Sequence, residues 1–289
     1  MIIYTDLYNR TKNYSLPNNI ISDIECKFNV TITTIINPKA EIYWGDKLTD
    51  QHLKEMPNIK WIHLSKTGYG KFNLPKNILI TNTPESSEGV AEFALTGILY
   101  LLRGLNQMTL DRKSFDSNIE YILPFHKIKC LIVGHGRIGK RLEELLRRLF
   151  IKTDKVTKKD NIKNILKLNS YNFIINCLPF NTTTLDYFNK SIFNCMNNNS
   201  YFLNVGRGET VNEDDLYDSL KTNKIKGAFL DVVKNEPIEK TNKLLSLNNV
   251  FISPHIANAL ENSLDTQVKA FTYNLIKYQN KQPLNNIIK

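Results

Sequence analysis

No stretch of this sequence is apolar for long enough to cross a lipid bilayer, which requires about 20 residues. The first six residues also lack the basic start and long apolar core of a secretion signal, so we interpret them as the beginning of a β-strand. These absences remove the usual signatures of membrane and secreted proteins. We therefore expect a cytoplasmic protein with no membrane partner.

Cysteine is also scarce, and the four cysteines lie far apart: Cys26, Cys130, Cys177 and Cys195. No two of them have the C-x-x-C spacing, so the sequence indicates neither a disulfide framework nor a zinc site. Reduced thiols are the default in a cytosol. We predict that the chain binds no metal.

Acidic residues are fewer than basic ones: 28 Asp and Glu stand against 38 Lys and Arg, a formal net charge of +10. Such a surplus can attract nucleic acids or anionic ligands. However, lysines occur throughout the chain, and no run of basic residues with interleaved aromatics is present. We interpret the charge as general composition, of benefit in attracting anionic substrates, and expect no nucleic-acid partner.

The length of 289 residues suggests two domains. Strand-like and helix-like segments alternate along the chain, which predicts an α/β fold with parallel sheets. The expected strands are residues 1–4, 32–36, 41–44, 61–64, 79–81, 130–133, 155–157, 173–177, 201–205, 227–230 and 250–252.

Two long helical segments suggest how the domains are connected. Residues 86–105 carry apolar side chains at helical spacing after a start rich in Ser and Glu, and could cross from one domain to the other. Residues 261–280 form a final helical segment that is long enough to return to the first domain. The first domain would then be discontinuous in sequence.

A glycine-rich motif marks the second domain. Residues Gly134 to Gly139 read GHGRIG and match G-x-G-x-x-G, between an apolar strand and a helix expected at 140–150. Gly134 would permit the tight turn, Gly136 would let the backbone approach a pyrophosphate, and Gly139 would let helix and strand pack closely. The helix N-terminus would add amide donors for the phosphates. We predict a dinucleotide site here.

The sequence leaves the choice of dinucleotide open. Asp154 lies 20 residues after Gly134, where an acidic residue would bind the ribose 2′-hydroxyl of NAD. If the strand instead ends at Thr157, Lys158 and Lys159, those side chains would favour the 2′-phosphate of NADP. We favour NADP and keep NAD as the alternative.

Three polar side chains follow successive predicted strands: Arg207, Glu236 and His255. Ligands bind at the carboxyl edge of an open parallel sheet, where these side chains would lie. Reduction of a 2-keto acid requires a cation for the carboxylate and keto oxygen, and an acid to protonate that oxygen. A carboxylate beside a histidine stabilises its protonated form. The set therefore predicts hydride transfer to a keto acid.

The sequence resembles the D-isomer-specific 2-hydroxyacid dehydrogenase family over nearly its whole length. The similarity is carried by five motifs in the family's order, GHGRIG at 134–139, NCLPFNTTT at 176–184, NVGRGETVNEDDL at 204–216, LDVVKNEP at 230–237 and SPHIA at 253–257. Such a resemblance implies an NAD(P)-dependent oxidoreductase that acts on the CH–OH group of donors. It also implies two Rossmann-like domains with the active site between them.

The resemblance also implies roles for individual residues. Arg207 would bind the carboxylate and keto oxygen, His255 would donate the proton, and Glu236 would pair with His255. A loop of the first domain would complete the substrate site through Lys66, Thr67 and Gly68. The implied cofactor contacts, beyond the three glycines and the residues at 157–159, are Arg137, Ile138, Cys177, Leu178, Pro179, Thr184, Val205 and Asp231, the last near the nicotinamide carboxamide.

These arguments predict a flavodoxin-like substrate domain from residues 1–90 plus 264–289, and a Rossmann domain from residues 91–263. The expected reaction is reduction of a small 2-keto acid such as glyoxylate or hydroxypyruvate, and the family implies a homodimer. Two alternatives remain at this point: a D-3-phosphoglycerate or other D-2-hydroxyacid dehydrogenase of the same family, and a non-catalytic module that senses NAD(P). The sequence does not identify the keto acid.

Overall fold

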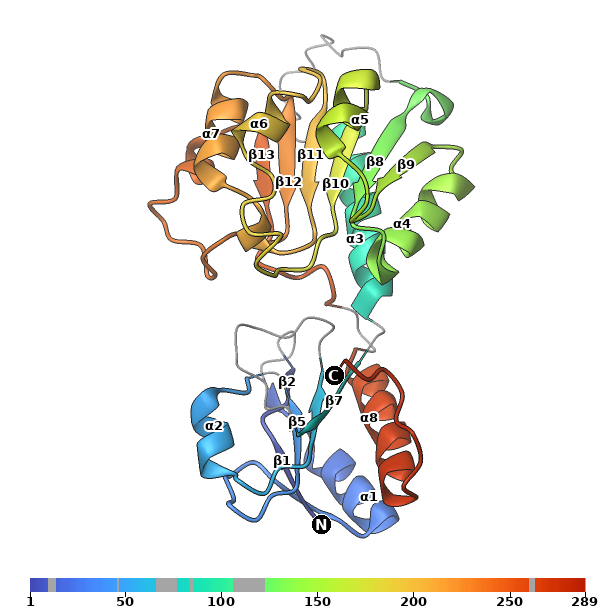
Figure 1. Cartoon of the computed structure of the whole chain (residues 1–289), viewed down its shortest axis with the longest axis vertical. Helices are drawn as coiled ribbons and strands as arrows, with labels where there is room; N and C mark the ends of the chain where they lie inside the picture. Colours follow the sequence, from blue (N-terminus) through green and yellow to red (C-terminus); the bar gives the residue numbers. More distant parts are fainter. Residues whose placement is uncertain are drawn as a thin grey trace, which may run out of the picture. The chain divides into compact units, whose positions relative to one another are not determined.

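The computed structural model describes residues 1–9, 14–45, 47–65, 77–83, 86–105, 123–259 and 263–288. The chain forms two compact units (Figure 1). Unit 1 comprises Met1–Ser86 with Ala259–Lys289, and unit 2 comprises Ser87–Asn258. Both ends of the chain thus build unit 1. Which ligand each unit binds remains a prediction, as does the domain division at residues 90/91 and 263/264.

Unit 1 is built around a five-stranded parallel sheet in the order β4-β1-β5-β6-β7. Its strands are β1 (Ile2–Thr5), β4 (Thr31–Thr33), β5 (Ile42–Gly45), β6 (Trp61–Leu64) and β7 (Leu79–Asn82). Its helices are α1 (Asn18–Phe28), α2 (Asp50–Glu55) and α8 (Ser263–Gln279). A short antiparallel pair, β2 (Tyr8–Asn9) and β3 (Tyr14–Ser15), lies outside the sheet.

Apolar side chains cover both faces of this sheet, as a parallel sheet requires. Trp44 stacks on Phe271 of α8 with ring centroids 4.0 Å apart, and Trp61 stacks on the same phenylalanine. His63 of β6 is fully buried, and its ring nitrogens lie 2.8 and 3.2 Å from the hydroxyls of Thr81 and Thr83. Burial lowers the His63 pKa to about 3, so this histidine is a neutral part of the core.

Unit 2 holds a six-stranded parallel sheet in the order β13-β12-β11-β10-β8-β9. Its strands are β8 (Lys129–Val133), β9 (Lys152–Val156), β10 (Phe173–Asn176), β11 (Tyr201–Asn204), β12 (Gly227–Leu230) and β13 (Val250–Ile252). Its α-helices are α3 (Ser86–Leu102), α4 (Arg137–Arg148), α5 (Ile162–Leu168), α6 (Lys190–Phe193) and α7 (Glu213–Lys221). Short 3-10 turns are η2 (Phe125–Lys127), η3 (Gly208–Thr210) and η4 (Lys243–Ser246).

Helices cover both faces of the unit 2 sheet. Apolar residues of α3 and α4 pack into one core cluster, and those of α5, α6 and α7 pack into the other. The inner strands β8, β10, β11 and β12 are almost completely buried, which explains their mainly apolar sequences. The predicted α/β class with two parallel sheets is confirmed. No helix in the described part of the chain is long and apolar enough to cross a membrane.

Three expectations about individual elements were wrong. The strand expected at 32–36 ends at Thr33, because the Ile35 amide donates to the Thr33 hydroxyl and turns the chain (3.0 Å). The strand expected at 155–157 begins earlier, at Lys152, because its polar residues occupy a sheet edge next to β8. The helix expected at 140–150 begins at Arg137, inside the glycine motif.

Candidate functional site

The glycine turn joins β8 to α4. Gly134 has φ = +96°, a conformation that favours glycine, and its amide donates to the carbonyl of Val156 at the end of β9 (3.0 Å). A Cβ atom at this position would lie 2.9 Å from the carbonyl carbon and oxygen of Cys177. The turn therefore has no room for a side chain.

The other two glycines serve different needs. Gly136 precedes the first residue of α4, and a Cβ there would meet no protein atom within 4 Å. Gly139 is buried, and a Cβ there would overlap the carbonyl oxygen of Gly134. The turn thus offers open space and free approach at its second glycine, in front of the N-terminus of a 12-residue helix. Arg137 and Ile138 lie in the first turn of that helix. This geometry fits the pyrophosphate of a dinucleotide.

The segment after β10 forms a wall beside the turn. It contains Cys177, Leu178 and Pro179; the Leu178 amide donates to the Asn176 side chain (3.0 Å), and the Thr184 hydroxyl donates to the Pro179 carbonyl (2.7 Å). Thr184 therefore stabilises this loop from inside. Burial raises the Cys177 pKa to about 12, so its thiol stays neutral. Val205, which follows β11, is also buried.

The residues at the end of β9 bear on the choice between NAD and NADP, which the sequence left open. Asp154 lies within the strand, and its carboxylate accepts from the Tyr171 hydroxyl (2.7 Å) and pairs with Lys129 (2.8 Å). The strand ends at Val156, so Thr157, Lys158 and Lys159 follow it directly. The two lysines are exposed, whereas the Thr157 hydroxyl donates to Asp160 (2.6 Å).

Arg207, Glu236 and His255 follow three adjacent strands, β11, β12 and β13. The Nδ1 atom of His255 lies 2.6 Å from Oε2 of Glu236. The second carboxylate oxygen of Glu236 accepts a longer hydrogen bond from the Val233 amide (3.3 Å). The structure therefore brings together the histidine and glutamate that the resemblance implied as a pair, and the Nε2 atom of His255 is left for other contacts.

Burial and neighbouring charges have opposing effects on the pKa values of Arg207 and Glu236. Burial lowers the pKa of the Arg207 guanidinium, against the opposing effects of Glu209 and Glu236. Burial alone would raise the Glu236 pKa, but its hydrogen bond and charge interaction with His255 and the charge of Arg207 lower it overall. Arg207 is thus a cation partly removed from water, and its Nη1 donates to the Gly206 carbonyl (2.7 Å). Such a group favours an anionic ligand.

Asp231 holds the loop that carries His255. Its carboxylate is buried and accepts from the Ser253 hydroxyl (2.8 Å) and from the amides of Ile256 (2.9 Å) and Ala257 (3.1 Å). The His255 amide donates to the Asp231 carbonyl (3.0 Å), and His255 itself has φ = +54°. Both carboxylate oxygens of Asp231 are therefore used within the protein, an arrangement that the resemblance did not suggest.

The sequence interpretation missed the polar network that holds Arg207. Asn176 and Asn204 are register partners at the ends of β10 and β11, and both are buried. Asn176 donates to Asn204 (2.9 Å) and to Thr210 (2.7 Å), and the Thr210 hydroxyl donates to the Arg207 carbonyl (2.6 Å). Each of two apolar strands ends in an asparagine, and this pattern in the sequence could have revealed the network.

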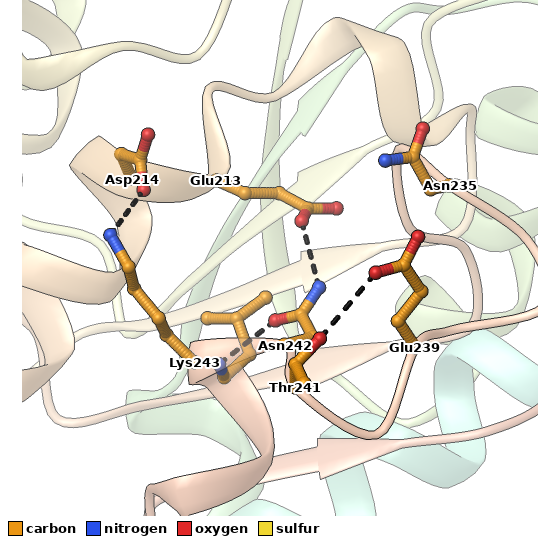
Figure 2. Close-up of a pocket in the computed structure, with 8 residues that line it drawn as sticks. Glu213, Asp214, Asn235, Glu239, Thr241, Asn242 and Lys243 are labelled. Carbon is orange, nitrogen blue, oxygen red and sulfur yellow. Dashed lines mark hydrogen bonds and ion pairs between the residues drawn. The ribbon is translucent and has the colours of Figure 1, made fainter.

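Lys66, Thr67 and Gly68 lie outside the described residues. A cavity of about 240 Å³ in unit 2 is lined by polar side chains that include Glu213 and Asp214 (Figure 2). Its carboxylates disfavour an anionic substrate.

Glu213 instead has a structural task at that cavity. One carboxylate oxygen accepts from the Lys234 amide (2.5 Å), and the other accepts from the Asn242 side chain (3.1 Å), as Figure 2 shows for Asn242. Lys234 belongs to the segment that leads from β12 to Glu236. Glu213 therefore ties this segment to the first turn of α7.

Comparisons with known proteins identify relatives along most of the chain. The probable 2-ketogluconate reductase of Dictyostelium discoideum is 29% identical over 76% of this chain and 72% of its own length. Glyoxylate/hydroxypyruvate reductase B of Klebsiella pneumoniae is 26% identical over 91% of this chain and 92% of its own length.

Solved structures show the same fold. A D-isomer specific 2-hydroxyacid dehydrogenase family protein from Klebsiella pneumoniae 342 matches with a TM-score of 0.85 at 20% identity, over 100% of this chain and 97% of the other. The D-lactate dehydrogenase of Aquifex aeolicus, complexed with NAD and lactic acid, matches with a TM-score of 0.79 at 24% identity, over 100% of this chain and 99% of the other.

A family model, the NAD binding domain of D-isomer specific 2-hydroxyacid dehydrogenase, matches residues 95–257. That match covers more than half of the 289 residues and contains the glycine turn together with Arg207, Glu236 and His255. The chain therefore belongs to the D-isomer specific 2-hydroxyacid dehydrogenase family, whose members are oxidoreductases that act on CH–OH donors with a nicotinamide cofactor.

Proposed function

We propose that this protein reduces a small 2-keto acid, glyoxylate or hydroxypyruvate, to the corresponding 2-hydroxy acid with NADPH. The observation that carries the proposal is the 2.6 Å pair of His255 and Glu236. Glu236 follows β12, which is adjacent to β11, the strand that leads to the partly desolvated cation Arg207. Relatives named hydroxypyruvate reductase and glyoxylate/hydroxypyruvate reductase, at 26% identity each, support this substrate class.

The proposed mechanism assigns one task to each side chain. Arg207 binds the substrate carboxylate and polarises the keto oxygen. When bound, the nicotinamide supplies the hydride that forms the new C–H bond at the keto carbon. His255 donates the proton from Nε2 to the keto oxygen, which becomes the hydroxyl. Glu236, held at Nδ1, stabilises the protonated ring and fixes its orientation.

The glycine turn and the wall beside it would hold the cofactor. Gly134, Gly136 and Gly139 shape the pyrophosphate site at the N-terminus of α4, and the segment 177–179 lines the groove. Arg137, Ile138, Thr184, Val205 and Asp231 remain proposed contacts or supports of that groove. In the first unit, Lys66, Thr67 and Gly68 remain the proposed substrate loop.

A substrate and cofactor panel tests the function. NADH and NADPH are each offered with glyoxylate, hydroxypyruvate, pyruvate and 3-phosphohydroxypyruvate, and loss of nicotinamide absorbance is recorded. His255→Ala should lower turnover by about 10²–10⁴-fold while dinucleotide binding is retained. Tight dinucleotide binding by the wild-type protein without turnover of any 2-keto acid would favour the sensing module, and near-normal turnover of the His255 variant would contradict the mechanism.

The proposed preference for NADPH depends on Lys158 and Lys159. Both are exposed directly after β9, beside the strand that leads into the glycine turn, whereas Asp154 is engaged within the strand. The fold alone does not choose, because an acyclic imino acid reductase of similar fold is complexed with NADPH and the Aquifex enzyme with NAD. Replacing both lysines with alanine should raise KM for NADPH about tenfold or more and leave KM for NADH within about twofold. Equal use of both cofactors by the wild-type protein would refute the preference.

We further propose a cytoplasmic homodimer that associates through α3. Partly exposed aromatic residues lie there: Phe93 and Tyr100 of α3 pack against Phe229, which stacks on Phe251 at 4.8 Å. Light scattering during gel filtration measures the mass. A monomeric mass at micromolar concentration would contradict the dimer.

A further inference from the structure

The positive charge of this protein is concentrated in one segment. Residues 127–167 contain 13 Lys and Arg but only 4 Asp and Glu, a net charge of +9. The whole chain has a net charge of +10, so the remaining residues contribute only +1. This uneven distribution revises our interpretation of the charge as general composition.

The segment folds into one edge of unit 2. It contains β8, α4, β9 and α5, and β9 is the outermost strand of the sheet next to β8 (Figure 1). Helix α4 packs on one face of the sheet and α5 on the other, so the charged residues surround this edge. We call this region the basic edge; it is defined by residues 127–167.

The acidic residues of the basic edge are already engaged. Glu143 pairs with His135 and Lys155, Glu144 pairs with Arg141 and Arg148, and Asp154 pairs with Lys129. The fourth, Asp160, accepts from Thr157. Eight exposed cations of the basic edge have no ion pair with a described residue: Lys127, Lys140, Arg147, Lys152, Lys158, Lys159, Lys163 and Lys167.

The basic edge is continuous with the dinucleotide site. The Gly134 amide bonds to the last residue of β9, Val156, and Lys158 and Lys159 follow that residue. A 2′-phosphate adds about two negative charges to a dinucleotide that already carries a charged pyrophosphate. The negative charge of the phosphorylated dinucleotide is therefore complementary to the positive charge of the basic edge.

We propose that the basic edge is a capture surface for the phosphorylated dinucleotide, which it draws from solution to the glycine turn. This inference rests on the proposed function for the identity of the cofactor. Fields of one sign over a surface raise association rates by about 10–10³-fold, and salt suppresses the effect. The lysines of the basic edge other than Lys158 and Lys159 act through this electrostatic field, without contact with the bound cofactor.

The test uses lysines of the basic edge that are remote from the proposed 2′-phosphate contact. The variant Lys152→Glu/Lys163→Glu/Lys167→Glu keeps Lys158 and Lys159. A matched control carries the same charge change on exposed lysines of unit 2 outside the basic edge, as Lys190→Glu/Lys221→Glu/Lys240→Glu. Stopped-flow nicotinamide fluorescence measures the association rate constants of NADPH and NADH at ionic strengths of about 0.01 M and 1 M, where the Debye length is about 30 Å and 3 Å.

The basic-edge variant should bind NADPH about tenfold more slowly at low ionic strength, and within twofold of wild type at high ionic strength. NADH, with fewer charges, should show a smaller decrease, about threefold, and kcat at saturation should not change. A matching variant with glutamine at the same three positions should show about half of the logarithmic effect. Circular dichroism verifies that each variant is folded.

If the association rate constant of NADPH decreases equally in the basic-edge variant and in its control, the proposal is overturned. The net charge of the protein, and not the location of that charge, would then govern binding. Association rates that do not change in either variant would overturn it as well. The proposed cofactor is tested separately: preference for NADH by the wild-type protein would refute that assignment, while the salt-dependent NADH rates would still decide whether the edge captures a dinucleotide.

Discussion

Replacing Asp231 with alanine should release the loop that carries His255. The substitution removes the acceptor of three hydrogen bonds and leaves the amides of Ile256 and Ala257 without a partner. A buried amide that loses its acceptor costs about 1–3 kcal/mol. The Ala257 amide is buried and the Ile256 amide is partly buried, so together they cost less than the about 6 kcal/mol that is the upper limit for two buried amides. Water entering the vacated space would reduce this penalty. We therefore expect the loop that carries His255 to lose about 3 kcal/mol of stability against local opening, which is about a 100-fold change in the opening equilibrium.

Hydrogen exchange of the loop measures this loss locally. The amides of Ser253 and His255 are suitable reporters, because they donate to the backbone carbonyls of Leu230 and Asp231, which the substitution leaves in place. Both should exchange about 100-fold faster in Asp231→Ala. Turnover should fall at least tenfold, because His255 is no longer held in its left-handed conformation, while KM for the dinucleotide changes little.

Two controls separate this role from others. Ser253→Ala removes one hydrogen bond to the carboxylate without leaving a backbone amide unpaired, so a loss of only about 1 kcal/mol is expected. Trp44 and Trp61 both lie in unit 1, so their fluorescence should be the same in all variants. If loop exchange in Asp231→Ala stays within twofold of wild type while KM for the dinucleotide rises, Asp231 acts through the cofactor and the reasoning is wrong.

The glycine turn offers a matched pair: Gly134→Ala should destabilise unit 2, because its Cβ meets backbone atoms at 2.9 Å, whereas Gly136→Ala should leave the unfolding temperature unchanged and weaken dinucleotide binding at least tenfold, as calorimetry would show. The pKa of Glu236 is lowered in the folded protein, so its ionised form stabilises the fold fully above its ordinary pKa and less as pH falls through the lowered value. Glu236→Gln should therefore flatten the dependence of the free energy of unfolding on pH below about pH 4.5. The same dependence in variant and wild type would count against this. Glu213→Ala should lower turnover about threefold to tenfold with little change in dinucleotide affinity, because the Lys234 amide loses its acceptor, and steady-state kinetics with a binding titration would distinguish this from a loss of cofactor.

The parts of the fold that could be predicted are those whose sequence pattern is strong. Five strands of unit 2, β8, β10, β11, β12 and β13, are mainly apolar in sequence, so they were predicted within one residue at each end. The edge strand β9 was displaced, because its polar residues make no apolar pattern and it is ordered by its pairing with β8. A strand is predicted from its apolar residues, and β9 has too few of them because most of its residues are exposed.

The site shows the same division. The spacing of Gly134, Gly136 and Gly139 predicted the turn, and the order of strand ends placed Glu236 and His255 at one sheet edge, because both follow from sheet topology. Their pairing was implied by the family resemblance. The supports of the site could not be predicted. Asp231 and Asn176 act through hydrogen bonds between segments far apart in sequence, and the choice of partner among many polar residues depends on three-dimensional packing.

The crowding around a single peptide links two glycines that lie far apart in sequence. A Cβ at Gly134 would press on the Cys177–Leu178 peptide. A Cβ at Gly206 would lie 2.6 Å from the Leu178 carbonyl oxygen of the next peptide, and 3.0 Å from the Leu178 nitrogen of the Cys177–Leu178 peptide. A shift of that peptide that accommodates one side chain also changes the room for the other, so the two positions are not independent. Epistasis is the evolutionary consequence: whether either glycine can be replaced depends on the residue at the other, and on how far the loop after β10 has already moved.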